Sequence, residues 1–115
     1  ELNRRVREKS PLFRKELEAL YDLDIVGDVR GDGYFFGVEL VKDKSTREKF
    51  DEEETDRLLR GILAPALWDA GLHCRTDDRG DPVIQLAPPL TIGENEFREI
   101  AQILRDAISG VINRL

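Results

Sequence analysis

The stretch that decides the fold is Val26-Gly27-Asp28-Val29-Arg30-Gly31-Asp32-Gly33-Tyr34-Phe35-Phe36-Gly37-Val38-Glu39-Leu40-Val41. Residues 25–29 and 34–41 are rich in β-branched and aromatic side chains, a composition that favours strands. The segment 30–33 between them is Arg-Gly-Asp-Gly, which supplies turn residues. The stretch therefore predicts two strands joined by a turn. Because the second strand is apolar on both faces for much of its length, we expect it to be central and covered.

Upstream, apolar residues recur every three to seven positions over 2–20, the spacing of one helical face. Pro11 interrupts this pattern. It either kinks the helix or restarts it with Ser10 as N-cap, since proline is tolerated at the first helical position.

Downstream, the charged run 42–54 predicts a solvated loop leading into a helix whose acidic start suits the positive end of the helix dipole. Pro65 should bend this helix, and Gly71 should end it. Its apolar face is expected to contain the following residues: Leu59, Ile62, Leu63, Ala66, Leu67 and Ala70.

Two short strands, 72–75 and 82–87, follow with a hairpin turn at 76–81. Thr91 and Glu94 have the spacing of a capping box and open a last helix. The residues that this helix should turn inward are Phe97, Ile100, Ala101, Leu104, Ile108, Val111 and Ile112. The order of elements predicts an α+β fold over 1–115, a single domain with helices packed on one face of a small, mostly antiparallel sheet.

The chain has 115 residues, with 18 basic and 24 acidic side chains and a net charge of −6. This length allows one domain, and the negative balance weighs against nucleic-acid binding. The longest apolar stretch, Ile62 to Trp68, is too short for a membrane span, and Glu1 to Arg5 is unlike a signal peptide. Cys74 is the single cysteine, which excludes an internal disulfide and favours a cytoplasmic location. The absence of Met leads us to expect a piece of a longer chain.

Few residues point to chemistry. His73 and Cys74 are adjacent, so on a strand they face opposite sides and cannot share a metal ion or form a catalytic pair. Neither the glycines of 27–33 nor the acidic run 51–54 matches a phosphate or calcium loop. Both Arg-Gly-Asp tripeptides, at 30–32 and 79–81, are expected in turns. We predict no metal site.

Arg75 is the one candidate binding residue. It ends the predicted strand 72–75 directly before the hairpin turn, within reach of the segment 87–90. A guanidinium group there is able to hold a carboxylate through two parallel hydrogen bonds. The alternative is an ordinary surface ion pair with Asp77 or Asp78.

Two motifs resemble the class III pyridoxal-phosphate-dependent aminotransferases, including the omega-aminotransferases. The segment 26–44 is similar to the family run VGDVRGxGxxxGxELVxDK, and 71–75 with 86–92 is similar to GLxxR followed by xxPPLxI. The resemblance implies the C-terminal small domain of such an enzyme, which transfers an amino group from an amine or amino acid to a keto acid or aldehyde. Asp32 departs from the apolar residue common in the family, and Pro65 and Trp68 match no family position.

The resemblance also implies where the functional groups lie. The Schiff-base lysine belongs to the large domain, so we expect no catalytic and no cofactor-binding residue among the lysines at 9, 15, 42, 44 and 49. Arg75 matches the arginine that in many members binds the substrate carboxylate. The chain alone is then inactive and does not hold pyridoxal phosphate, and its partners are the large domain of the same parent chain and a second subunit. The competing hypothesis is a free-standing α+β interaction or regulatory module without catalysis.

Overall fold

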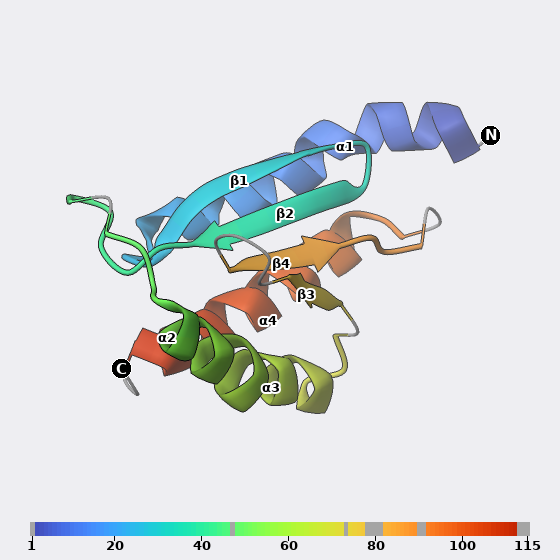
Figure 1. Ribbon diagram of the computed structural model, residues 1–115. Helices are drawn as coiled ribbons and strands as arrows, with labels where there is room; N and C mark the ends of the chain where they lie inside the picture. Colours follow the sequence, from blue (N-terminus) through green and yellow to red (C-terminus); the bar gives the residue numbers. More distant parts are fainter. Residues whose placement is uncertain (1, 47, 73, 78–81, 90–91, 113–115) are drawn as a thin grey trace.

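The computed structural model describes residues 2–46, 48–72, 74–77, 82–89 and 92–112 (Figure 1). It has the predicted α+β composition. The elements in chain order are α1 (Leu2–Glu18), η1 (Ala19–Asp22), β1 (Val26–Asp32), β2 (Phe35–Leu40), α2 (Glu52–Asp56), η2 (Arg57–Leu63), α3 (Ala64–Asp69), β3 (Arg75–Asp77), β4 (Val83–Leu86) and α4 (Glu94–Ile112).

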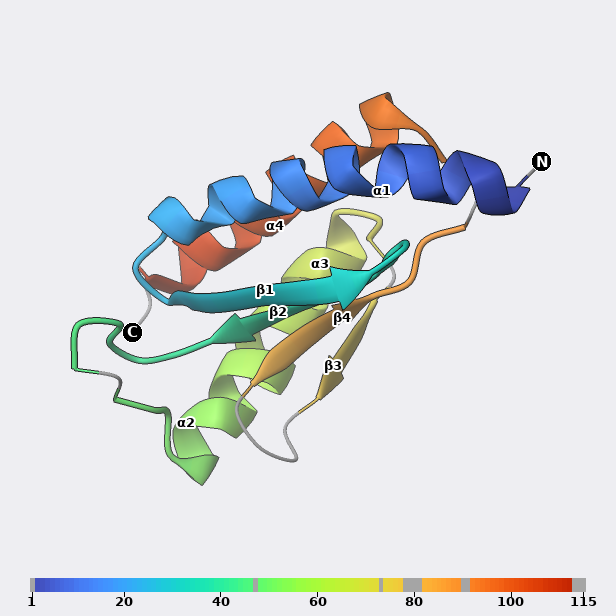
Figure 2. The same ribbon diagram turned by 90° about the horizontal axis from the view of Figure 1, so that it is seen from above.

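The four strands form one antiparallel sheet in the order β1-β2-β4-β3. Helices α1 and α4 lie side by side along the same face of this sheet (Figure 2), and α4 also contacts η2 and α3. The prediction of helices on one face of a small antiparallel sheet is therefore confirmed. No helix within the described ranges is long and apolar enough to cross a lipid bilayer.

Strand β1 is longer than the sequence predicted. Its pairing with β2 continues to Asp32, which lies opposite Phe35, so the tripeptide 30–32 belongs to the strand and not to the turn. The strands approach closely at Gly31, whose φ is +155° and where an added Cβ would lie 2.1 Å from the Phe35 carbonyl oxygen. Gly31, which we assigned to the turn, therefore allows β1 and β2 to approach each other closely. The change of direction occurs at Gly33, with φ +58°.

Strand β2 is central, as predicted, but only one of its faces is covered. Phe36, Val38 and Leu40 are buried, whereas the Phe35 side chain is 60% exposed and the residues at 37 and 39 are intermediate. The expectation of cover on both faces is wrong because every packed helix lies on the same side. We call the face that carries Phe35 and Glu39 the outer face.

Helix α1 runs through Pro11 without interruption, which excludes the restart with Ser10 as N-cap, one of our two alternatives. The Ser10 hydroxyl instead donates a hydrogen bond of 2.6 Å to the Gly33 carbonyl oxygen. Two residues beyond the proline, Phe13 is buried at the centre of an aromatic cluster. Its ring contacts those of Tyr34, Phe36 and Phe97 at centroid distances of 5.9, 5.2 and 4.8 Å.

The second helical segment begins with a capping box, in which the Asp51 side chain accepts from the Glu54 N–H and the Glu54 side chain accepts from the Asp51 N–H. Its acidic start is as predicted. The backbone widens to a π-helix in η2, immediately before Pro65, whose missing N–H removes a normal helical bond. Gly71, with φ +87°, follows the helix end.

The apolar face of this segment is only partly as expected. Leu59, Leu63 and Leu67 are buried, but Ala70 is exposed and Leu58, which our expected set did not include, is buried. Leu58 lies four residues before Ile62 and so belongs to the same helical face, and Ala70 is exposed because it caps the helix end.

The hairpin β3–β4 pairs as predicted, with different bounds. Strand β3 begins at Arg75, whereas we predicted that the strand would end there. Thr76 and Asp77, which we assigned to the turn at 76–81, belong to β3, so that part of the prediction is wrong. The rest of the predicted turn and the capping residue Thr91 lie outside the described residues. Helix α4 turns its expected face inward, with the following residues buried: Phe97, Ile100, Ala101, Leu104, Ile108 and Val111.

Candidate binding face around Arg75

Arg75 lies at the start of β3, the edge strand of the sheet, and its side chain is exposed. The next residue, Thr76, lies opposite Ile84, which is fully buried in the core. Because side chains alternate along a strand, Arg75 belongs to the outer face. The sheet backbone fixes its position, while its exposed side chain is left free to change conformation.

Strand register places Arg75 in a row that crosses the whole sheet. Arg75 is opposite Gln85, Gln85 is opposite Gly37, and Gly37 is opposite Arg30. The row therefore has an arginine at each end, with an amide side chain and a glycine between them. A Cβ added at Gly37 would meet the Val83 side chain at 3.2 Å. Sequence reasoning placed Arg75 near 87–90 and did not identify Gln85, because it did not fix the register.

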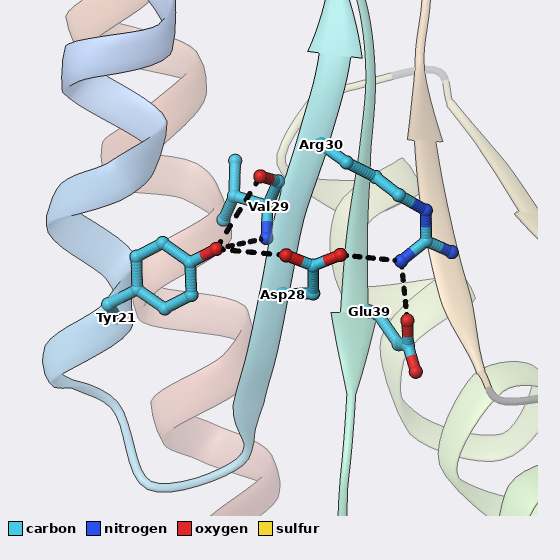
Figure 3. A network of polar contacts seen from close by, with 5 residues as sticks. All are labelled: Tyr21, Asp28, Val29, Arg30 and Glu39. Atoms are coloured by element: carbon cyan, nitrogen blue, oxygen red, sulfur yellow. Dashed lines mark hydrogen bonds and ion pairs between the residues drawn. The ribbon is translucent and has the colours of Figure 1, made fainter.

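Arg30, at the other end of the row, is held by two carboxylates (Figure 3). Its Nη1 donates to Asp28 Oδ2 over 3.0 Å and also pairs with Glu39 on the neighbouring strand. The hydrogen bond to Glu39, followed by that to Asp28, raises the pKa of the Arg30 guanidinium. The positive charge of Arg30 is thus compensated within the sheet.

Tyr21 extends this network to the helical layer. Its hydroxyl donates to Asp28 Oδ1 over 3.1 Å and accepts from the Val29 backbone N–H over 2.7 Å (Figure 3). Partial burial is the main cause that raises the pKa of the Tyr21 hydroxyl. No sequence motif indicated this network. Asp28 and Arg30 alternate along β1 opposite Glu39 on β2, and with the strand register known this charge pattern would have indicated the network.

Arg75 is electrostatically different from Arg30. Among the side chains that the structure describes, no carboxylate forms an ion pair with Arg75. The alternative, a surface ion pair with Asp77 or Asp78, falls on the Asp77 side chain and on Asp78, which lie outside what the structure describes, as does the second Arg-Gly-Asp at 79–81. Of the two arginines in the row, Arg30 is the one that described carboxylates hold.

The lysines do not fit a pyridoxal-phosphate site. Lys9 pairs with Glu94 at 3.1 Å, Lys42 pairs with Glu54 at 2.7 Å, and Lys44 donates to the Tyr21 carbonyl oxygen. Lys15 and Lys49 have exposed side chains on α1 and in the loop before α2. A Schiff-base lysine requires a shaped, water-excluding site. None of these positions in the described chain offers one.

Metal and thiol chemistry have no support in the described ranges. No group of three His, Cys, Asp or Glu side chains there is arranged to hold a metal ion. Cys74 is half-buried against the core, and this burial raises the pKa of its thiol, which disfavours the reactive thiolate. His73 lies outside the described residues.

Comparison with known proteins identifies relatives over nearly the whole chain. Residues 1–108 match the sequence profile of the family described as Aminotransferase class-III. A probable aminotransferase of Mycobacterium tuberculosis is 56% identical over 108 residues, which are 94% of this chain and 23% of that protein. The adenosylmethionine-8-amino-7-oxononanoate aminotransferase of Methanocaldococcus jannaschii is 39% identical over 103 residues, 90% of this chain and 21% of that protein.

Solved structures agree with these relatives. A transaminase from the marine bacterium Virgibacillus superposes with a TM-score of 0.88 at 26% identity, over 98% of this chain and 25% of that one. The crystal structure of the Methanocaldococcus jannaschii enzyme gives a TM-score of 0.79 at 38% identity, over 95% of this chain and 24% of that one. The chain thus spans about a quarter of the length of the relatives that it matches.

Proposed function

The chain belongs to the class III aminotransferase family, and we propose that it forms the C-terminal small domain of a pyridoxal-phosphate-dependent transaminase. The parent enzyme transfers an amino group from an amine or amino acid to a keto acid or aldehyde. The relatives' names and the fold of the solved transaminases support this proposal. Their greater length, about four times that of this chain, supports a parent that also contains a large domain.

Arg75 is the residue that we assign to the substrate. It binds the carboxylate of an amino acid or keto acid through its two terminal guanidinium nitrogens. The observation that carries this assignment is the contrast within one row: Arg30 is held by Asp28 and Glu39, whereas Arg75 has no ion-pair partner among the described side chains. An exposed arginine on a fixed strand is suited to a ligand that is present in one half-reaction and absent in the other.

The cofactor belongs to the rest of the parent enzyme. Pyridoxal phosphate, when bound, acts as the electron sink for the carbanion that forms at the substrate carbon. Because three lysines of this chain are engaged in other contacts and the other two are exposed, we assign the Schiff-base lysine and the phosphate-binding groups to segments outside it. The contribution of this domain is therefore binding and orientation of substrate, beside the large domain of its own chain and within a homodimer.

The assignment of Arg75 is tested in the full-length enzyme by Arg75→Ala. Loss of a charge-assisted, two-point contact should raise the Michaelis constant for a keto acid about 10- to 100-fold, with a much smaller effect on an amine that has no carboxylate. Arg30→Ala is the matched control, because it removes the same group from the same face, and it should leave the ratio of the two constants unchanged. Equal effects of Arg75→Ala on acid and amine would overturn the assignment.

The cofactor assignment has its own test on the isolated 115-residue chain. Titration with pyridoxal phosphate should give no saturable absorption band of an internal Schiff base, and the chain should show no transaminase activity. A saturable band, abolished by replacing a single lysine, would contradict the placement of the lysine in another segment.

A further inference from the structure

The neighbours of Arg75 on β4 have a common property. Gln85 lies directly opposite, and the diagonal neighbours of Arg75 across the strand pair are Val83 and Ala87. None of these three side chains carries a charge. Side chains directly opposite each other in an antiparallel pair have Cβ atoms about 5 Å apart, so a charge at position 85 would act on Arg75 at close range.

The other end of the row shows what charged neighbours do on this same sheet. Arg30 lies opposite Gly37, with Glu39 on the diagonal and Asp28 two residues away on its own strand. Both carboxylates form ion pairs with its guanidinium. Arg30 and Arg75 thus occupy equivalent outer-face positions at opposite ends of one row, and their cross-strand neighbours differ in charge. On its own strand Arg75 has Asp77 two residues away, as Arg30 has Asp28, and the Asp77 side chain lies outside what the structure describes.

We propose that Gln85 is a specificity-determining residue, because its uncharged side chain opposite Arg75 places no carboxylate across the strand pair that would compete with a substrate carboxylate for the guanidinium. This inference rests on the proposed function. It concerns amino acids and keto acids, the substrates that carry the carboxylate. Substrates without a carboxylate gain nothing from the absence of a competing charge at position 85.

A carboxylate at position 85 would act in two ways. It would pair with Arg75, as Glu39 pairs with Arg30, so a substrate acid would have to displace that pair. It would also repel the incoming carboxylate of the substrate. Exposed cross-strand charge pairs are individually weak, so the two effects together should raise the Michaelis constant for a keto acid about three- to tenfold.

The test uses the full-length enzyme with three variants and two substrates, a keto acid and an amine without a carboxylate. Gln85→Glu adds one charge with almost no change of shape. Gln85→Met has a similar length and no charge. Gln102→Glu makes the same chemical change on α4, at an exposed position outside the sheet.

We expect Gln85→Glu to raise the Michaelis constant for the keto acid three- to tenfold with little change in kcat and no change for the amine, while the other two variants stay close to wild type. If Gln85→Met has the same effect as Gln85→Glu, or Gln102→Glu raises the constant equally, the inference is wrong. If Gln85→Glu has no effect while Arg75→Ala impairs use of the acid, Gln85 loses its role and the function of Arg75 stands. If Arg75→Ala affects acid and amine equally, both assignments fail.

Discussion

The Tyr21 hydroxyl accepts a hydrogen bond of 2.7 Å from the backbone N–H of Val29, on the outer edge of the sheet. An edge strand presents unpaired backbone groups that invite pairing with another chain. Side chains of the first helical region cover this edge: Arg14 donates to the Gly31 carbonyl oxygen, and Ser10 donates to that of Gly33. Strand β1 is therefore closed to further strand pairing by its own chain.

Removal of the hydroxyl in Tyr21→Phe should lower the free energy of unfolding by about 1 kcal/mol, because the Val29 N–H loses its partner in a partly buried position. Tyr34→Phe is the matched control, since it removes the same atom from a longer hydrogen bond, 3.3 Å to the Ile92 carbonyl oxygen. Its cost should be smaller. Urea unfolding of the 115-residue chain measures both. A larger loss in Tyr34→Phe would contradict the role that we give to Tyr21.

A glycine pair tests the close approach of β1 and β2. Gly31→Ala places a methyl group 2.1 Å from the Phe35 carbonyl oxygen, at a φ of +155°, and should cost about 3 kcal/mol or more. Gly110→Ala is the same substitution in the exposed part of α4, where an added Cβ meets no atom within 4 Å. It should stabilise the helix by about 0.5 to 1 kcal/mol. Thermal unfolding of both variants should therefore shift in opposite directions.

Much of the fold could be predicted from local patterns. The period of Phe97, Ile100, Leu104 and Ile108 identified α4, and β-branched and aromatic runs identified the hairpin strands. These signals are strong because one face of an amphipathic helix or strand is buried along its whole length, so its apolar residues repeat with a fixed period. The family motifs then identified the domain.

The errors share a physical origin, since each depends on contacts between segments that are far apart. Gly31 looked like a turn residue because the sequence does not show how closely β2 approaches it. Gln85 became visible as the neighbour of Arg75 only when the strand register was known.

The aromatic cluster offers a test of the one-sided sheet. Phe97 is fully buried and stacks on Phe13 at a centroid distance of 4.8 Å, so Phe97→Ala should cost about 3 to 5 kcal/mol by leaving a cavity. Phe35→Ala removes the same side chain from the outer face, where it is 60% exposed, and should cost less than about 1 kcal/mol in the isolated chain. Chemical denaturation compares the two. Similar losses would show that the outer face is packed against something in solution.

The pair Lys42–Glu54 predicts a pH effect of known sign. Lys42 Nζ lies 2.7 Å from Glu54 Oε2, and this contact is the main cause that lowers the pKa of the Glu54 carboxyl below its ordinary value of 4.5. A carboxyl whose pKa is lower in the folded state stabilises the fold above its unfolded pKa, and this contribution is lost as the pH falls through the folded value. The loss of folding stability at acid pH that is due to Glu54 should therefore occur below about pH 5.

Lys42→Met should raise the pKa of Glu54 toward 4.5, though not fully, because the Asp51 N–H still donates to the carboxylate. Lys44→Met is the control: it removes a lysine two residues away whose Nζ contacts the Tyr21 carbonyl oxygen, and it should leave the pKa of Glu54 unchanged. Carboxyl carbon chemical shifts followed from pH 2 to 7 measure these values directly. Since both groups are exposed, the shift should also shrink in high salt. A Glu54 pKa that is the same in wild type and Lys42→Met would refute the pairing. Equal changes of this pKa in both lysine variants would show that general surface charge, and not the contact with Lys42, lowers it.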